Sequence, residues 1–78
     1  MITKATNVYD SSLVRESTYE YETKLLTITF PSAIYHYHDV SVEDYEEFVE
    51  ADSQGKALNS IIKNKYEFTK IETEDVTN

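Results

Sequence analysis

The chain has 78 residues, of which 15 are acidic and seven are basic, and it carries a net charge of −8 and no cysteine. We expect a single domain over residues 1–78, because a second core would have too little apolar area to bury. The lack of cysteine excludes disulfides and thiolate chemistry and is typical of a reducing compartment. The negative charge argues against binding to duplex DNA, since it repels phosphates.

The sequence predicts neither a signal peptide nor a transmembrane helix. The first nine residues are polar and lack the apolar centre of a signal peptide. No stretch approaches the ~20 apolar residues that a transmembrane helix requires. We therefore expect a cytoplasmic protein.

The first clear element is a strand over residues 25–30, where apolar side chains alternate with two threonines. Residues 31–33, Pro-Ser-Ala, interrupt it, because proline fixes φ and removes a backbone donor. Residues 34–38 are rich in aromatic and β-branched types, which predicts the returning strand of a hairpin. A weaker alternation over residues 13–21 predicts a third strand, which would support a hairpin that is marginal alone.

Two helices are predicted after the sheet. Ser41 and Asp44 approximate a capping box, so the first helix should begin at Ser41 and end near Asp52. The second helix should run from Lys56 to about Lys65. We expect the Asp52 carboxylate to cap it, and the one glycine of the chain, at position 55, to mark a tight turn or a close approach.

These elements predict an α+β fold: a three-stranded antiparallel β-meander followed by two α-helices packed on one face. We expect the domain core to span about residues 7–71, with a frayed tail over 72–78. Apolar residues at strand and helix spacing define the predicted core, namely Leu26, Ile28, Phe30, Phe48, Val49, Leu58, Ile61 and Ile62.

The order and spacing of several short motifs resemble those of the KTSC domain family. This small module is named for its occurrence at the C-terminus of some lysyl-tRNA synthetases and also stands alone in bacteria and phages. The motifs are a strand ending in Phe30, Tyr35-His36-Tyr37, Val40, a helix, Ala51-Asp52-Ser53-Gln54-Gly55, Asn59, Ile62 and Tyr66.

The resemblance covers roughly residues 7–71 and has two departures. Ser32 stands where the family usually has a turn glycine, and Leu58 stands where it favours an aromatic residue. Both positions are structural. The resemblance implies no established activity, although an RNA-binding role has been suggested for the family.

Four tyrosines form one candidate binding surface. Tyr35 and Tyr37 lie two apart on a strand and point to one face. Together with Tyr19 and Tyr21 on the neighbouring strand they could form a row of rings that stacks on nucleic-acid bases. The alternative is that these rings cover the core, because so small a domain has few other large side chains to bury.

Catalytic and metal chemistry have little support in the sequence. His36 and His38 share a face at metal-ligand spacing, but the chain has no further histidine and no cysteine to complete a zinc site. Neither Asp52 nor Ser53 has a recognisable partner for acid–base or nucleophilic catalysis. We therefore predict no enzyme activity, no metal and no cofactor.

The leading hypothesis is a non-enzymatic binding module, for instance a phage or mobile-element protein that binds a host protein with a basic surface. Residues 25–55 contain seven acids and no Lys or Arg. Such a protein could inhibit its target or mimic nucleic-acid charge, although charge runs are often only solvated faces. The predicted partner-binding residues are Glu43, Glu46, Glu47 and Glu50.

Two alternatives remain open, and so does the oligomeric state. The first is a small-molecule or nucleotide binder that sequesters its ligand, with Lys56, Lys63 or Lys65 contacting phosphate. The second is a single-stranded RNA-binding module, which the net charge opposes. The predicted ligand-binding residues are Tyr19, Tyr35, Tyr37, His36, Ser53, Lys56 and Asn59.

Overall fold

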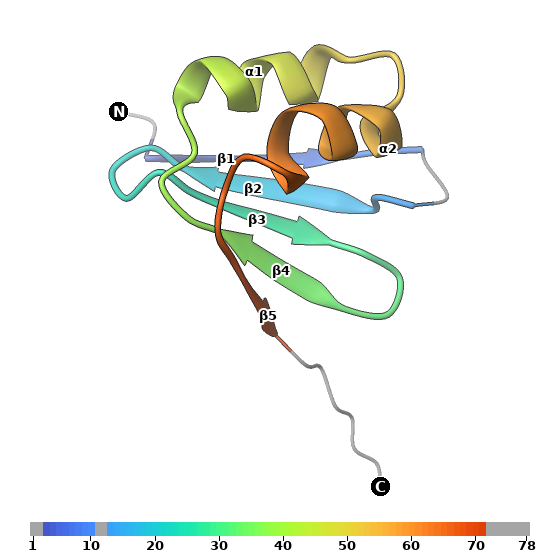
Figure 1. The fold of residues 1–78 in the computed structure, drawn as a ribbon, viewed down its shortest axis with the longest axis horizontal. Coiled ribbons are helices and arrows are strands. Elements are labelled where there is room, and N and C mark those ends of the chain that lie inside the picture. Colours follow the sequence, from blue (N-terminus) through green and yellow to red (C-terminus); the bar gives the residue numbers. More distant parts are fainter. Residues whose placement is uncertain (1–2, 11–12, 72–78) are drawn as a thin grey trace, which may run out of the picture.

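The computed structural model describes residues 3–10 and 13–71, which form one antiparallel sheet with helices on one of its faces (Figure 1). The predicted α+β class, the antiparallel sheet and the placement of the helices on one face are confirmed. The predicted number of strands is wrong, because the sheet has five strands in the order β1-β2-β3-β4-β5. The elements are β1 (Lys4–Val8), β2 (Glu16–Glu20), β3 (Leu25–Thr29), β4 (Ile34–Tyr37), α1 (Val42–Glu50), α2 (Gln54–Ala57), the π-helix η1 (Leu58–Lys63) and β5 (Phe68–Ile71).

The predicted hairpin joins β3 and β4. Leu26 pairs with Tyr37 and Thr29 with Ile34, and the backbone N–H of Phe30 donates to the carbonyl of Ala33 at 2.8 Å. The turn therefore lies at Pro31-Ser32-Ala33, as the proline predicted.

Strand β1 was missed because it is mostly polar. It pairs with all five residues of β2, and the one polar side chain on its inner face, Asn7, has a buried hydrogen-bond partner. The Asn7 amide donates to the Tyr45 hydroxyl at 2.9 Å. Just beyond the strand, the Tyr9 hydroxyl lies 2.7 Å from Oγ of Ser17, which is fully buried. Strand β1 is therefore held in place by hydrogen bonds, and it lacks the alternation of apolar and polar residues by which a strand is predicted from sequence.

Strand β5 was missed because it is short and exposed. It has four residues, three of them exposed, and it pairs with β4 through contacts such as Tyr37 opposite Phe68. The predicted tail over 72–78 lies outside the described residues.

The first helix begins where it was predicted to begin, with Ser41 as its N-terminal cap. Ser41 Oγ accepts from the N–H of Asp44 at 3.2 Å, and α1 ends at Glu50. The prediction that Asp52 caps the second helix is wrong. Ser53 lies directly before α2, and its Oγ accepts from the N–H of Lys56 at 3.3 Å, while Asp52 is exposed.

The second helical segment changes type midway. The short α2 continues into η1, a wider π-helical turn of the kind often found at functional sites. Gly55 lies in α2 without a positive φ. Its role is close approach, because an added Cβ would lie 3.1 Å from Cδ2 of Leu13.

The core lies between the sheet and the helices and contains more tyrosine than apolar patterning predicts. Of the eight predicted core residues, Leu26, Ile28, Phe48, Leu58 and Ile62 are buried, whereas Phe30, Val49 and Ile61 are half-buried and pack against them. Tyr19, Tyr37 and Tyr45 are also buried. Burial of two of these rings is possible because their hydroxyls find partners: Tyr19 donates to the carbonyl of Val40 at 2.5 Å, and Tyr45 accepts from the Asn7 amide. Within the described residues, no helix has the length and apolar content to cross a membrane.

Candidate functional site

The four predicted partner-binding glutamates form one exposed surface on α1, which we call the acidic stripe. Its members are Glu43, Glu46, Glu47 and Glu50, and all are exposed. Tyr45 and Phe48 point from the same helix into the core. Across residues 3–10 and 13–71, the one salt bridge joins Lys65 to Asp44, so no glutamate of the stripe forms a salt bridge there. The pKa of Lys65 is raised mainly by its hydrogen bond to Asp44 and more weakly by the charge of Glu47.

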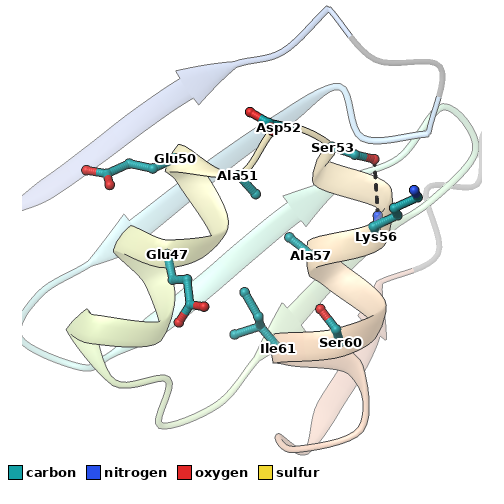
Figure 2. Close-up of a pocket in the computed structure, with 9 residues that line it drawn as sticks. All are labelled: Glu47, Glu50, Ala51, Asp52, Ser53, Lys56, Ala57, Ser60 and Ile61. Atoms are coloured by element: carbon teal, nitrogen blue, oxygen red, sulfur yellow. Dashed lines mark hydrogen bonds between the residues drawn. The ribbon is translucent and has the colours of Figure 1, made fainter.

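A groove of about 610 Å³ separates α1 from α2 and η1 (Figure 2), and we call it the inter-helix groove. Small and aliphatic side chains form part of its lining, and two glutamates of the acidic stripe lie beside it. The Ser53 and Lys56 side chains lie on the α2 side. The lining residues are Glu47, Glu50, Ala51, Asp52, Ser53, Lys56, Ala57, Ser60 and Ile61. Aliphatic surface beside carboxylates suits a lysine or arginine side chain, whose stem is apolar and whose head is charged.

The end of α1 is electrostatically unfavourable for glutamates. Its last turn contains no basic residue, although the negative end of a helix favours cations. Gln54 satisfies carbonyls of this end, with its Nε2 donating to Ala51 O at 3.0 Å. That amide supplies hydrogen bonds but no positive charge. Glu47 and Glu50 therefore lie at the negative end of α1 with no basic residue in the same turn.

The predicted row of four tyrosines does not form. Strand β3 lies between β2 and β4, so Tyr19 and Tyr35 are separated by a strand. Tyr19 stacks on Tyr45 at 4.4 Å between ring centroids and is 1% exposed. Burial raises the pKa of the Tyr19 phenol, with a smaller contribution from Tyr21. The structure therefore places the Tyr19 ring in the core, where it is not accessible for stacking on a ligand.

Tyr35 and Tyr37 belong to a second groove, of about 490 Å³, which we call the aromatic groove. Four rings line it in a connected cluster. Tyr35 lies 5.2 Å from both Phe30 and Phe68, and Tyr37 lies 5.7 Å from Phe68, measured between ring centroids. Asn59, Lys63 and Lys70 also line this groove.

The predicted ligand-binding residues therefore do not make one site. Tyr35, Tyr37 and Asn59 line the aromatic groove, whereas Ser53 and Lys56 line the inter-helix groove. His36 lies on the sheet face away from the helices, paired with Thr27 and Thr69. Sequence reasoning missed Phe68 and Lys70, which a period-two reading of residues 68–71 could have placed on one face.

The described residues contain no group of three or more side chains that could hold a metal ion. His38 instead lies 2.9 Å from the Thr69 hydroxyl. The Lys65 and Tyr66 side chains donate hydrogen bonds to Asp44 and hold the pKa of that carboxyl below its ordinary value. This cluster is tied to Ser41 at the start of α1, so its geometry is that of a helix cap.

Comparison with known proteins places this fold and sequence in one family. The family model of the KTSC domain matches residues 10–66. A lysine–tRNA ligase from Nostoc punctiforme is 33% identical over 63 residues, which cover 80% of this chain and 11% of the ligase. The crystal structure of a KTSC domain protein from Yersinia pestis is similar with a TM-score of 0.81 and 26% identity, over 87% of this chain and 97% of that one. The chain belongs to the KTSC domain family.

Proposed function

We propose that this domain is a non-enzymatic binding module that docks a protein with a basic surface on the acidic stripe. The observation that carries this proposal is the exposure of Glu43, Glu46, Glu47 and Glu50 without a salt bridge to any described residue. These charges disfavour the isolated fold, because like charges three or four apart on a helix repel. A cationic partner would remove that repulsion.

The inter-helix groove supports a particular mode of docking. A lysine or arginine of the partner could lay its aliphatic stem against Ala57 and Ile61 while its head reaches Glu47 or Glu50. The same cation would sit at the negative end of α1, where the dipole favours it. Lys56 lines the same groove, so the partner must approach from the α1 side.

A partner whose basic surface normally holds nucleic acid would be blocked by this contact. By covering that surface, the module would act as an inhibitor whose carboxylates imitate the charge of phosphates. If the module is encoded by a phage, its target would be a host protein. Electrostatic docking of this kind speeds association and depends strongly on salt. The salt dependence therefore distinguishes it from an apolar contact.

The test compares two variants of equal charge. The stripe variant replaces Glu43, Glu46, Glu47 and Glu50 by Gln. The control variant replaces Asp10 by Asn and Glu16, Glu22 and Glu67 by Gln, so that both carry a net charge of −4 instead of −8. Each is immobilised and exposed to lysate, and the retained proteins are identified by mass spectrometry.

We expect the parent and the control variant to retain the same basic protein, and the stripe variant to lose it while remaining folded by circular dichroism. Purified, that protein should associate more slowly at higher salt. If the folded stripe variant retains every protein that the parent retains, at low and at physiological salt, the acidic stripe is only a solvated face.

A further inference from the structure

We propose that the aromatic groove is a second binding site, separate from the acidic stripe, for a mononucleotide, that is, a flat aromatic base joined through a ribose to one phosphate. The groove lies between strands β4 and β5 on one side and η1 on the other. Its chemistry differs from that of the acidic stripe. Four rings and two lysines line it, and none of its described lining residues is acidic.

The rings offer a surface on which a base can stack. Phe68 is 51% exposed, although a ring of this size is normally buried where the fold allows it. Tyr35 contacts both Phe30 and Phe68 and is only half-buried. Tyr37 forms the buried end of the cluster, at 2% exposure. An exposed aromatic side chain is the kind of surface on which nucleic-acid bases stack, and the ring contacts with Tyr35 and Tyr37 hold Phe68 in place.

The lysines supply positive charge at the same groove in a strongly acidic protein. Lys70 pairs with Tyr35 across β5 and β4, which places both on one face of the sheet. Lys63 comes from η1 on the other side. Both are exposed, and neither forms a salt bridge with any part of the chain that the structure describes. A phosphate in the groove would be attracted by two cations and repelled by no lining carboxylate.

The π-helical turn contributes to the same site. Asn59 and Lys63 both belong to η1 and both line the groove. Departures from regular α-helix of this kind recur at functional sites. The Asn59 side-chain amide carries a donor and an acceptor, which can pair with the edge of a base.

The size and charge of the groove favour a single nucleotide over a strand. Its volume of about 490 Å³ lies within the range of roughly 300–1,000 Å³ that is usual for small-molecule sites. A strand-binding surface requires a positive track that follows many phosphates. Here two lysines stand in a chain with a net charge of −8, which matches one phosphate group.

The experiment follows the backbone amide signals of the ¹⁵N-labelled protein by NMR while AMP or UMP is added. Adenosine, which lacks the phosphate, and ribose 5-phosphate, which lacks the base, are titrated in parallel. We expect AMP or UMP to give saturable shifts centred on Tyr35, Asn59, Lys63 and Phe68, and each partial ligand to bind more weakly.

Two variants locate the site, and both alter exposed residues so that the fold is kept. Replacing Lys63 and Lys70 by Gln should weaken the binding of AMP about tenfold or more, because the contact with the phosphate is lost. The affinity for adenosine, which has no phosphate, should change little. Replacing Phe68 by Ala should weaken the binding of both AMP and adenosine, because the base loses the ring on which it stacks. The matched control replaces Lys4 and Lys24, also exposed lysines, by Gln and should bind AMP almost as the parent does.

Three results would overturn the proposal. The first is the absence of saturable shifts with millimolar AMP and UMP. The second is AMP binding that the lysine variant and its control weaken equally. The third is binding of a single-stranded oligonucleotide by a protein that binds neither mononucleotide. The stripe variant should bind AMP at least as well as the parent, so this test and the test of the acidic stripe fail independently.

Discussion

The phenol of Tyr66 donates a 2.6 Å hydrogen bond to Oδ2 of Asp44, 22 positions earlier in the chain. Nζ of Lys65 reaches the same oxygen at 2.7 Å, and the backbone N–H of Ser41 donates to the Tyr66 hydroxyl at 3.2 Å. These bonds join the first turn of α1 to the segment that leads into β5. The capping box suggested by Ser41 and Asp44 is thus completed by a residue from outside the helix.

Replacing Tyr66 by Phe should lower the free energy of unfolding by about 1–2 kcal/mol, because it removes a hydrogen bond to a charged group and the acceptor of the Ser41 N–H. Urea denaturation of the purified variant measures this loss. Lys65→Ala serves as the control and should lower the free energy of unfolding less than Tyr66→Phe does, since the ion pair is exposed on the lysine side. A larger loss in Lys65→Ala than in Tyr66→Phe would contradict this assignment.

The stability that Asp44 contributes should depend on pH in one direction. Its hydrogen bonds to Lys65 and Tyr66 lower the folded-state pKa below the ordinary value of 3.8, so folding favours the carboxylate. The contribution is therefore complete above that value and is lost as the pH falls through the lower folded-state pKa. The difference in unfolding free energy between the parent and Asp44→Asn should shrink on acidification. If the difference in unfolding free energy between the parent and Asp44→Asn is the same at neutral pH and at about pH 2.5, the charge of Asp44 is not the source of its stabilising effect.

Replacing Phe48 by Ala should cost about 3–5 kcal/mol, because its side chain is fully buried between α1 and the sheet. That is a large share of the ~5–15 kcal/mol by which a domain is stable, so thermal melting should show a partly unfolded variant. Phe68→Ala, at a ring that is 51% exposed, is the control and should melt close to the parent. If Phe48→Ala melts within a degree or two of the parent, α1 does not pack as described.

The turn between β2 and β3 offers a stabilising change. Lys24 has a φ of 60°, a left-handed conformation that costs a residue with a Cβ about 1 kcal/mol or more. Lys24→Gly should therefore raise the midpoint of urea denaturation. Glu22→Gly, in the same exposed turn but without positive φ, should lower it, because there glycine only adds freedom to the unfolded chain. Equal effects of the two changes would argue against strain at Lys24.

The stripe variant described above should also be slightly more stable than the parent. Each like-charged pair three or four apart on α1 is destabilising by about 0.2–0.5 kcal/mol. The gain should be largest at low ionic strength and disappear in high salt, which screens exposed charges. Chemical denaturation in urea at two salt concentrations measures it. A stripe variant less stable than the parent at low salt would show that the glutamates make contacts that favour the fold.

Local patterns in the sequence determined the elements that depend on neighbouring residues. Alternation and Pro31 placed the hairpin of β3 and β4, and the hydroxyl of Ser41 marked the start of α1. The helical spacing of Tyr45 and Phe48 separated the buried side of α1 from the acidic stripe. In each case the physical cause acts within a few residues, through backbone sterics, capping or one-sided burial.

Only the tertiary structure decided which distant side chains meet. The polar strand β1 is held by pairing with β2 and by hydrogen bonds such as that from Asn7 to Tyr45. Pairing of β5 with β4 placed Phe68 and Lys70 beside Tyr35 and so formed the aromatic groove. Packing of α1 on the sheet stacked Tyr19 on Tyr45 and buried it. These outcomes rest on strand order and on contacts between residues far apart in the chain, which local alternation and composition do not encode.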